Sequence, residues 1–225
     1  MGYAGIDINM GCPVKDVTKT GACSALIETP ELAGQLIAAA KTSGLPVSVK
    51  TRIGFKSRKT EEWLSFLLRQ DIAALTVHAR TAKEMSKVPA HWEEFSVARQ
   101  LRDTIAPETK IIGNGDIKDR QHGEQLAAEH NLDGIMIGRG IFTNPYCFER
   151  QPQTHDREEL LGLLHYHLNM FDQVAATEQR KYDPLKRFYK IYIRNFDGAS
   201  ELRDKLMHTR STDEARALLD TLSLT

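Results

Sequence analysis

"PVSVKTRIG", residues 46–54, contains the change of character that decides the fold of this chain. Its first half is rich in β-branched valine, which is typical of a buried strand. Its second half changes abruptly to Lys50, Arg52 and Gly54. An apolar strand that ends in charged residues and glycine predicts a functional site at the carboxyl end of that strand.

Four other segments repeat this pattern, so we expect strands to begin near residues 6, 47, 74, 110 and 134, with helices between them. The strands are near-continuous apolar runs, which is typical of a parallel sheet covered on both faces. Each strand ends in polar, charged or glycine residues: Asn9 and Cys12, Lys50 and Arg52, His78 and Arg80, Asn114 and Asp116, Gly138 and Arg139.

Two fold classes place ligands at the carboxyl ends of parallel strands. A (β/α)8 TIM barrel builds its site from the loops after every strand, whereas a doubly wound open sheet uses one switch point. Functional residues follow every strand here, so we favour an α/β fold of the TIM-barrel type. A closed barrel needs about eight strands, so we expect an incomplete barrel, about strands 4 to 8, lacking roughly three N-terminal βα units.

The pattern changes near Gln151, after which helical segments continue to the end of the chain. The sequence therefore predicts a partial barrel over residues 1–150 and a small all-α helical bundle over residues 151–225. "DPLKRFYKIYIRNF" is expected to be one helix, with aromatic residues on one face. Its surroundings form a local basic patch, which predicts nucleic-acid binding: Arg180, Lys181, Lys186, Arg187, Lys190 and Arg194.

Composition sets further limits on this chain of 225 residues. Lysine plus arginine equals aspartate plus glutamate, 30 against 30, so bulk charge indicates no particular partner. Three cysteines at irregular spacing suggest neither a disulfide framework nor a metal site, and they fit a reducing cytoplasm. We expect no signal peptide and no membrane span.

Five blocks occur in order along the chain: "IDINMGCPVKDVTKTGACSALIETPEL", "VSVKTRIG", "LTVHART", "IIGNGDI" and "GIMIGRG". Together they resemble the tRNA-dihydrouridine synthases, and the resemblance covers nearly the whole chain. It implies a flavin-containing (β/α)8 barrel followed by a helical tRNA-binding domain. It also implies FMN as cofactor, NADPH as reductant, tRNA as substrate, and a protein that is monomeric when full length. The reaction would reduce the C5–C6 double bond of particular uridines.

The resemblance assigns roles to individual residues. Cys12 matches the proton donor of the family, and an ordinary thiol, with a pKa of about 8.5, stays mostly protonated at neutral pH. The rival interpretation of Cys12 is an inert buried cysteine. Lys50 matches a cation that stabilises reduced flavin. The expected cofactor-binding residues are Asn9, Lys50, His78, Asn114, Gly115, Asp116, Gly138 and Arg139.

Several roles stay open at this point. Asn9 contacts the flavin or the uracil edge, or it caps its own loop. Arg52 binds FMN or RNA, or pairs with a carboxylate. His78 contacts flavin or is structural, and Arg80 lies on the substrate side or is structural. Asp116 orders its loop or a ribityl hydroxyl.

The sequence also departs from the family pattern. An Ala-Pro-Met-type strand end is absent, and Cys23 stands where we expect glycine; a positive φ there would cost about 1 kcal/mol. One alternative function is a truncated, catalytically inactive tRNA-binding remnant, and another is a flavin barrel for a small substrate. Retention of Cys12 and Lys50 favours an enzyme, and the basic aromatic segment favours tRNA.

Overall fold

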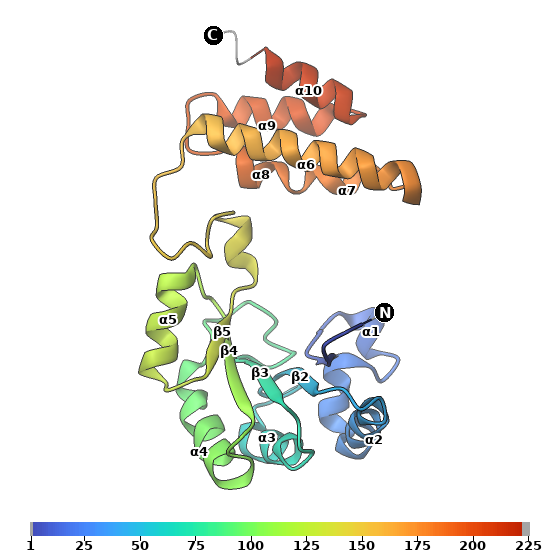
Figure 1. Ribbon diagram of the computed structural model, residues 1–225, viewed down its shortest axis with the longest axis vertical. Helices are drawn as coiled ribbons and strands as arrows, with labels where there is room; N and C mark the ends of the chain where they lie inside the picture. Colours follow the sequence, from blue (N-terminus) through green and yellow to red (C-terminus); the bar gives the residue numbers. More distant parts are fainter. Residues whose placement is uncertain (1, 222–225) are drawn as a thin grey trace. The chain divides into compact units, whose positions relative to one another are not determined.

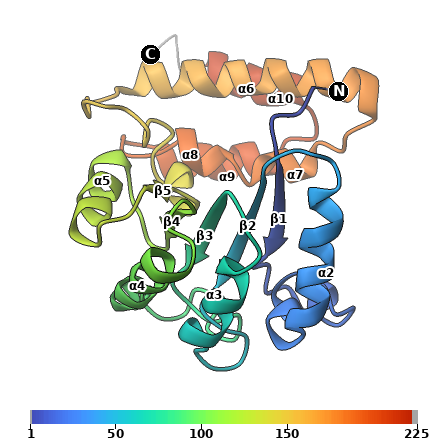
Figure 2. The same cartoon turned by 60° about the horizontal axis from the view of Figure 1, so that its bottom comes forward.

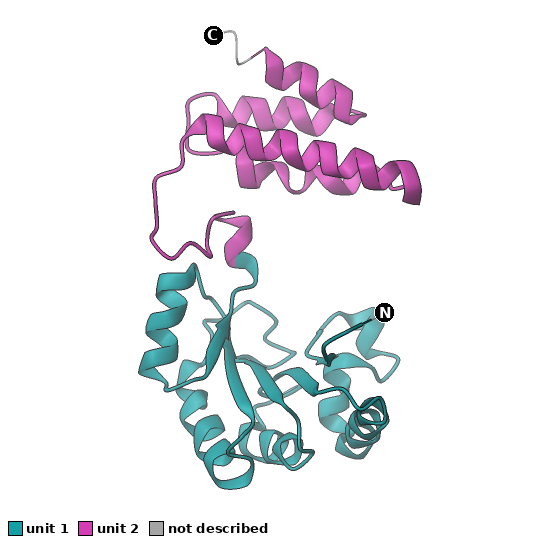
Figure 3. Cartoon of the chain, in the orientation of Figure 1, with its two compact units in different colours: residues 1–139 teal, residues 140–225 magenta. Residues whose placement is uncertain are grey.

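The chain forms two compact units, Met1–Arg139 and Gly140–Thr225 (Figure 3). The computed structural model describes residues 2–221. The division lies before the boundary predicted at residue 150. The physical reason is a contact within the second unit, because the ring of Phe142 stacks on that of Phe188 at 5.9 Å between centroids.

Strands and helices alternate through the first unit (Figure 1). All five predicted strand starts are confirmed, because each strand begins in or directly beside an apolar run. The elements are β1 (Ile6–Met10), α1 (Lys15–Thr18), η1 (Cys23–Glu28), α2 (Pro30–Lys41), β2 (Val47–Arg52), α3 (Thr60–Leu68), β3 (Ala74–His78), η2 (Trp92–Glu94), α4 (Phe95–Ile105), β4 (Lys110–Asn114), α5 (Arg120–Glu129), β5 (Gly134–Met136) and η3 (Arg139–Phe142).

Within the described residues the sheet has five strands in the order β1-β2-β3-β4-β5. Every pairing is parallel, and each strand pairs only with its neighbours along the chain. A doubly wound sheet reverses its strand order at a switch point. The unreversed order is that of a barrel wall, which agrees with the α/β class expected from the sequence.

One face of the sheet is a dry apolar layer. Ile8, Val49, Leu75 and Ile111 lie in one row across four strands, and the last three are buried. Helices α2, α3 and α4 cover this face (Figure 2) and share one hydrophobic core with it. Burying each large apolar side chain stabilises the fold by about 1.5–3 kcal/mol.

Helix α3 illustrates how the sequence produces this layer. Trp63, Leu64, Leu67 and Leu68 repeat at helical spacing, and all four are buried. The indole N–H of Trp63 donates to Thr51 Oγ1 at 2.9 Å, so the one polar atom of this large side chain is satisfied inside the core.

The opposite face differs from the expectation of apolar cover on both sides. Its rows are mostly polar: Asn9 pairs in register with Lys50, and Lys50 with Thr76. Nearer the carboxyl ends, Arg52, His78 and Asn114 form the next row. Because register fixes which side chains share a face, five short strands gather these groups on one surface.

The second unit is helical throughout its described elements: α6 (Arg157–Glu178), α7 (Asp183–Lys186), α8 (Tyr189–Tyr192), α9 (Ala199–His208) and α10 (Thr212–Asp220). Asp156 and Glu159 form a reciprocal capping box that begins α6. Leu164, Leu168 and Leu206 lie at the centre of a core separate from that of the first unit.

The single helix predicted for "DPLKRFYKIYIRNF" is wrong, because α7 and α8 are two short helices. Leu185, Tyr189 and Ile191 are all buried. In one continuous helix Ile191 would point away from the face shared by Leu185 and Tyr189. The break allows all three side chains to enter the core. Because of it, the basic residues of this segment do not share one face of a continuous helix.

None of the helices in residues 2–221 combines the length and the apolar composition that a membrane span requires. The same part of the chain holds no group of three or more histidine, cysteine, aspartate or glutamate residues that could bind a metal ion.

Candidate functional site

Cys12 lies in the loop directly after β1, and two neighbours define the shape of that loop. The side-chain oxygen of Asn9 accepts a hydrogen bond from Gly11 N at 3.0 Å. The carbonyl of Cys12 accepts from Ser24 N at 3.3 Å and from Ser24 Oγ at 2.7 Å. Asn9 therefore caps its own loop, which was one of its open roles, and the half-buried Cys12 is held from both sides.

Arg52 ties this loop to the loop after β3. Its guanidinium donates to the carbonyls of Gly11 at 2.8 Å, Thr81 at 3.1 Å and Met85 at 3.0 Å. Burial first, and then the positive charge of Arg80, lower the pKa of Arg52 to about 10, so it stays charged at neutral pH. Within the described residues Arg52 pairs with backbone carbonyls and with no carboxylate, and its predicted binding of FMN or RNA stays open.

Lys50 lies two residues earlier on β2 and is different. It is half-buried, and within residues 2–221 its amine makes no hydrogen bond or ion pair. Burial first, and then the positive charge of Arg52, lower the pKa of Lys50. A cation that is desolvated and has no partner is suited to an incoming anion.

His78 ends β3 and is in contact with Arg80. The guanidinium of Arg80 donates to His78 Nε2 at 3.1 Å, and because a guanidinium can only donate, the ring proton is on Nδ1. Burial first, and then the charges of Arg52, Lys50 and Arg80, lower the pKa of His78 to about 3. At neutral pH His78 is therefore a neutral ring with Nδ1–H as its donor.

Asp116 joins two arginines at the end of β4. Its carboxylate accepts from the buried Arg80, from Ala90 N at 2.9 Å and from Arg139 at 3.3 Å. Burial alone would raise the pKa of Asp116, but the hydrogen bonds from Arg80 and Ala90 hold it below its ordinary value. Asp116 orders these loops, and Arg139 keeps an exposed guanidinium.

Asn114 and the glycines shape the floor of this region. The amide of Asn114 donates to the Met136 carbonyl at 2.7 Å and so fastens β4 to β5. Gly115 has φ +133, and a Cβ there would meet the Cβ of Ala90 at 2.7 Å, so only glycine fits. At Gly138 a Cβ would meet only Asn114 Nδ2, at 4.0 Å, which leaves its backbone open to a ligand.

The predicted strand-end residues thus lie at one edge of the sheet, and their contacts divide them. Arg52 and Arg80 are saturated by backbone and carboxylate partners. Lys50, His78 Nδ1–H and the Arg139 guanidinium keep donors available. This edge is rich in cations and donors, which suits an anionic ligand with polar edges.

The basic segment of the second unit is divided in the same way. Lys186 is 12% exposed, pairs with Asp183 at 2.8 Å and lies over the Tyr182 ring. Arg180 pairs with Glu178 at 2.6 Å. Lys181, Arg187 and Lys190 are exposed, and in the described part of the chain no carboxylate pairs with them; Arg194 also has none but is half-buried.

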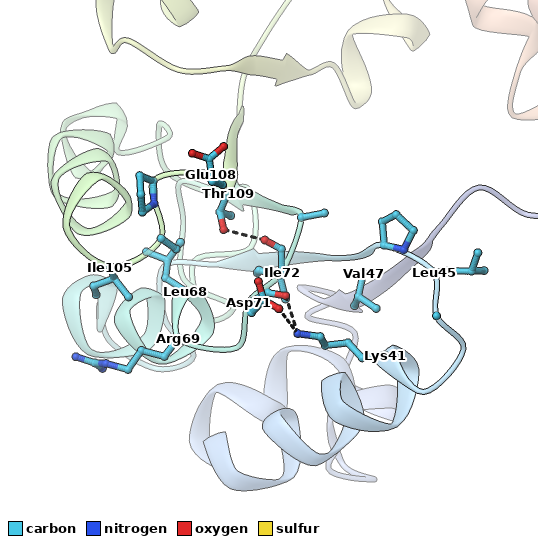
Figure 4. Close-up of a pocket in the computed structure, with 15 residues that line it drawn as sticks. Lys41, Leu45, Val47, Leu68, Arg69, Asp71, Ile72, Ile105, Glu108 and Thr109 are labelled. Carbon is cyan, nitrogen blue, oxygen red and sulfur yellow. Dashed lines mark hydrogen bonds and ion pairs between the residues drawn. The ribbon is translucent and has the colours of Figure 1, made fainter.

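A hollow of about 810 Å³ lies at the other end of the strands (Figure 4). Lys41 reaches Asp71 there at 2.6 Å, and Thr109 Oγ1 donates to the Ile72 carbonyl at 2.8 Å. The amino ends of barrel strands serve stability, and chemistry is found at the carboxyl ends. We therefore place the candidate site with Cys12 and not in this hollow.

Sequence analysis missed two supporting residues. Ser24 is fully buried against the Cys12 carbonyl, and the indole of Trp92 donates to the Gly115 carbonyl at 3.2 Å. Neither residue type indicates a function by itself. Ser24 lies inside a sequence block that resembles the family, and Trp92 lies between two such blocks. Cys23, which stands where the family pattern has glycine, has a φ of +53.

Comparison with known proteins gives a consistent result. The family model described as "Dihydrouridine synthase (Dus)" matches residues 1–224. A probable tRNA-dihydrouridine synthase 2 of Bacillus subtilis is 56% identical over 221 residues, which are 98% of this chain and 68% of that protein. A probable tRNA-dihydrouridine synthase of Staphylococcus epidermidis is 54% identical over 222 residues, which are 98% of this chain and 68% of that protein. A probable tRNA-dihydrouridine synthase of Staphylococcus aureus is 53% identical over 221 residues, which are 98% of this chain and 67% of that protein.

The match over residues 1–224 lends no support to the prediction that an N-terminal part of the barrel is missing, and that prediction stays untested. The family match extends through both units. This chain belongs to the dihydrouridine synthase family.

Proposed function

We propose that this protein is a flavin-dependent oxidoreductase that reduces the C5–C6 double bond of particular uridines in tRNA. The observation that supports it most is the position of Cys12. Its thiol stands at the carboxyl end of β1, in a loop fixed by Ser24 and Arg52, at the edge where Lys50 and His78 keep free donors.

Cys12 would supply the proton. Reduction of the double bond adds hydride at C6, moves the π electron pair to C5, and there takes a proton from the thiol. Arg52 holds the Cys12 loop through the Gly11 carbonyl at 2.8 Å, so it would keep the thiol in place for this step. Solvent would then restore the proton of Cys12.

The donor set fits a flavin mononucleotide. When bound, reduced FMN would supply the hydride for C6, and NADPH would reduce the flavin again. Lys50 offers an amine, without a hydrogen-bond or ion-pair partner among residues 2–221, for an anionic ring edge. His78 offers Nδ1–H, and Gly138 with Arg139 offers open backbone and a guanidinium for the phosphate.

The second unit would bind tRNA through its exposed cations. Lys181, Arg187 and Lys190 have no acidic partner in the described part of the chain, so they are free to contact phosphates. The division of labour into a catalytic unit and an RNA-binding unit is part of the proposal. An inactive tRNA-binding remnant is less favoured, because Cys12 and Lys50 are retained.

The test uses the purified protein with FMN, NADPH and tRNA transcribed without modifications. Nucleosides from the digested tRNA are analysed by mass spectrometry, and uridine heavier by two hydrogens is expected. Lys50→Met is the matched control, and it should lose flavin absorbance as well as product. A protein that binds FMN and oxidises NADPH with tRNA present, yet yields no such nucleoside, would overturn the proposal.

A further inference from the structure

The backbones of Cys12 and Cys23 are held together. Ser24, the residue directly after Cys23, donates two hydrogen bonds to the Cys12 carbonyl, from its N at 3.3 Å and from its Oγ at 2.7 Å. The side chain of Ser24 is fully buried, so this link is shielded from water. Two covalent bonds on either side of the Ser24 N–Cys12 O hydrogen bond separate the two Cα atoms, so the backbones of Cys12 and Cys23 are neighbours.

The two thiols also share one small region. Both are half-buried, and both are free. Burial first, and then the negative charge of a Cys12 thiolate, raise the pKa of Cys23, while the backbone amide of Cys12 acts in the opposite direction. Each group is therefore within electrostatic reach of the other.

The backbone conformation of Cys23 is a second, independent observation about this pair of cysteines. Its φ of +53 lies in the left-handed region, where a side chain costs about 1–2 kcal/mol and glycine costs little. Packing does not demand a thiol at such a position, because the side chain is only half-buried. A strained residue beside a reactive group points to a chemical role.

We propose that Cys12 and Cys23 are an oxidative modification site, at which hydrogen peroxide joins the two thiols in a disulfide that reversibly withdraws Cys12. That the disulfide stops catalysis rests on the proposed function, in which Cys12 delivers the proton. The formation of the disulfide itself does not.

The reaction balances in two steps. The Cys12 sulfur attacks peroxide, an S–O bond forms, the O–O bond breaks, and one water leaves with the thiol proton. The Cys23 sulfur then attacks the Cys12 sulfenic acid, an S–S bond forms, the S–O bond breaks, and a second water leaves. Two thiols are oxidised by two electrons in total, and peroxide is reduced to two waters.

Peptide mapping of the whole protein tests the disulfide directly. After peroxide treatment, blocking of free thiols and digestion with trypsin, Cys12 lies in the peptide of residues 1–15 and Cys23 in that of residues 20–41. We expect a linked pair of these two peptides that dithiothreitol separates. If Cys12 is oxidised and no linked pair forms, the proposal is wrong.

Two variants sharpen this result. Cys23→Gly suits the left-handed backbone, and Cys23→Ser keeps a small polar side chain, so at least one should fold normally. In both, Cys12 should proceed to the sulfinic and sulfonic acids, which dithiothreitol does not reverse. Cys147→Ser, at a buried position in the other unit, should behave like the unchanged protein. Equal over-oxidation of Cys12 with and without Cys23 would overturn the proposal.

An activity arm separates this inference from the proposed function. Uridine reduction should fall after peroxide and return at least tenfold on adding dithiothreitol, but only in the protein that retains Cys23. A linked pair that forms without loss of turnover would reject Cys12 as proton donor and leave the modification site standing. Turnover that is lost and restored equally in Cys23→Gly would reject the site and leave the proposed function standing.

Discussion

The strand-end site of the first unit and the basic segment of residues 180–194 contrast sharply. At the strand ends, Lys50, Arg52 and His78 share the edge that their positions predict. In the basic segment, the single helix that the sequence predicts is not formed, because α7 and α8 are separate helices. Side chains alternate between the two faces of even a short strand. Residues four apart share a face only where the helix is unbroken.

The two regions also share a lesson about positive charge. In each region, some cations are hydrogen-bonded or ion-paired within the protein, and others are available to a ligand. Arg52 is saturated by three carbonyls whereas Lys50 is not, and Lys186 is paired with Asp183 whereas Lys190 is exposed. The partner of a cation, and not its charge, indicates whether it serves architecture or a ligand.

The largest effect is expected from Cys12→Ala, which tests whether the strand-end site is catalytic. Uridine reduction should slow by roughly 10²–10⁴-fold, the usual contribution of a positioned proton donor. Flavin absorbance should not change, because the proposed cofactor contacts come from Lys50, His78, Gly138 and Arg139. Single-turnover product formation measures the effect, and a rate near that of the unchanged protein would remove Cys12 from the mechanism.

Arg52→Gln tests whether a saturated cation is architectural. The carbonyls of Gly11, Thr81 and Met85 would lose their buried donor, so the free energy of unfolding should fall by about 2–4 kcal/mol. Urea denaturation measures the loss. Lys50→Gln on the same strand is the matched control and should change stability by less than about 1 kcal/mol. Equal losses in both variants would abolish the distinction between the two cations.

His78 provides a pH-dependent test of the same edge. Its pKa is about 3 in the folded protein and about 6.5 in an unfolded chain, so the unfolded state binds more protons between these values. The contribution of neutral His78 is full above about pH 6.5 and is lost as pH falls towards about 3. Between about pH 7 and about pH 4.5 we expect a loss on the order of 2 kcal/mol.

His78→Gln removes the titrating ring but keeps an acceptor for Arg80. In urea denaturation at both pH values, this variant should lack most of the loss seen in the unchanged protein. An identical loss in the two proteins would mean that His78 titrates normally, and that its burial and cationic neighbours have little effect.

The smallest effect is expected in the basic segment. Changing Lys181, Arg187 and Lys190 together to glutamine should weaken tRNA binding about tenfold and reduce the salt slope of log K by roughly 2–3 units. Lys186→Gln, which removes the paired lysine, should leave the slope unchanged. Filter binding at several salt concentrations measures both. A slope that depends on Lys186 and not on the exposed cations would reverse our assignment.

The sequence predicted well what depends on local pattern. Apolar runs located all five strand starts, which lie within the residues that the structure describes. It could not predict the partners of Arg52, because these carbonyls come from two loops far apart in the chain. The helix break near Arg187 depends on burying Ile191, which is a property of the assembled core.

The unreversed strand order has a consequence for how the protein is made. Since no strand of the described sheet waits for a partner beyond its neighbours along the chain, each βα segment can dock as soon as it leaves the ribosome. Pairing of strands that are close in the sequence also lowers the entropic cost of loop closure, and this speeds folding. We expect the sheet to be assembled vectorially from β1 towards β5, with each new strand adding to the edge left by the strand before it.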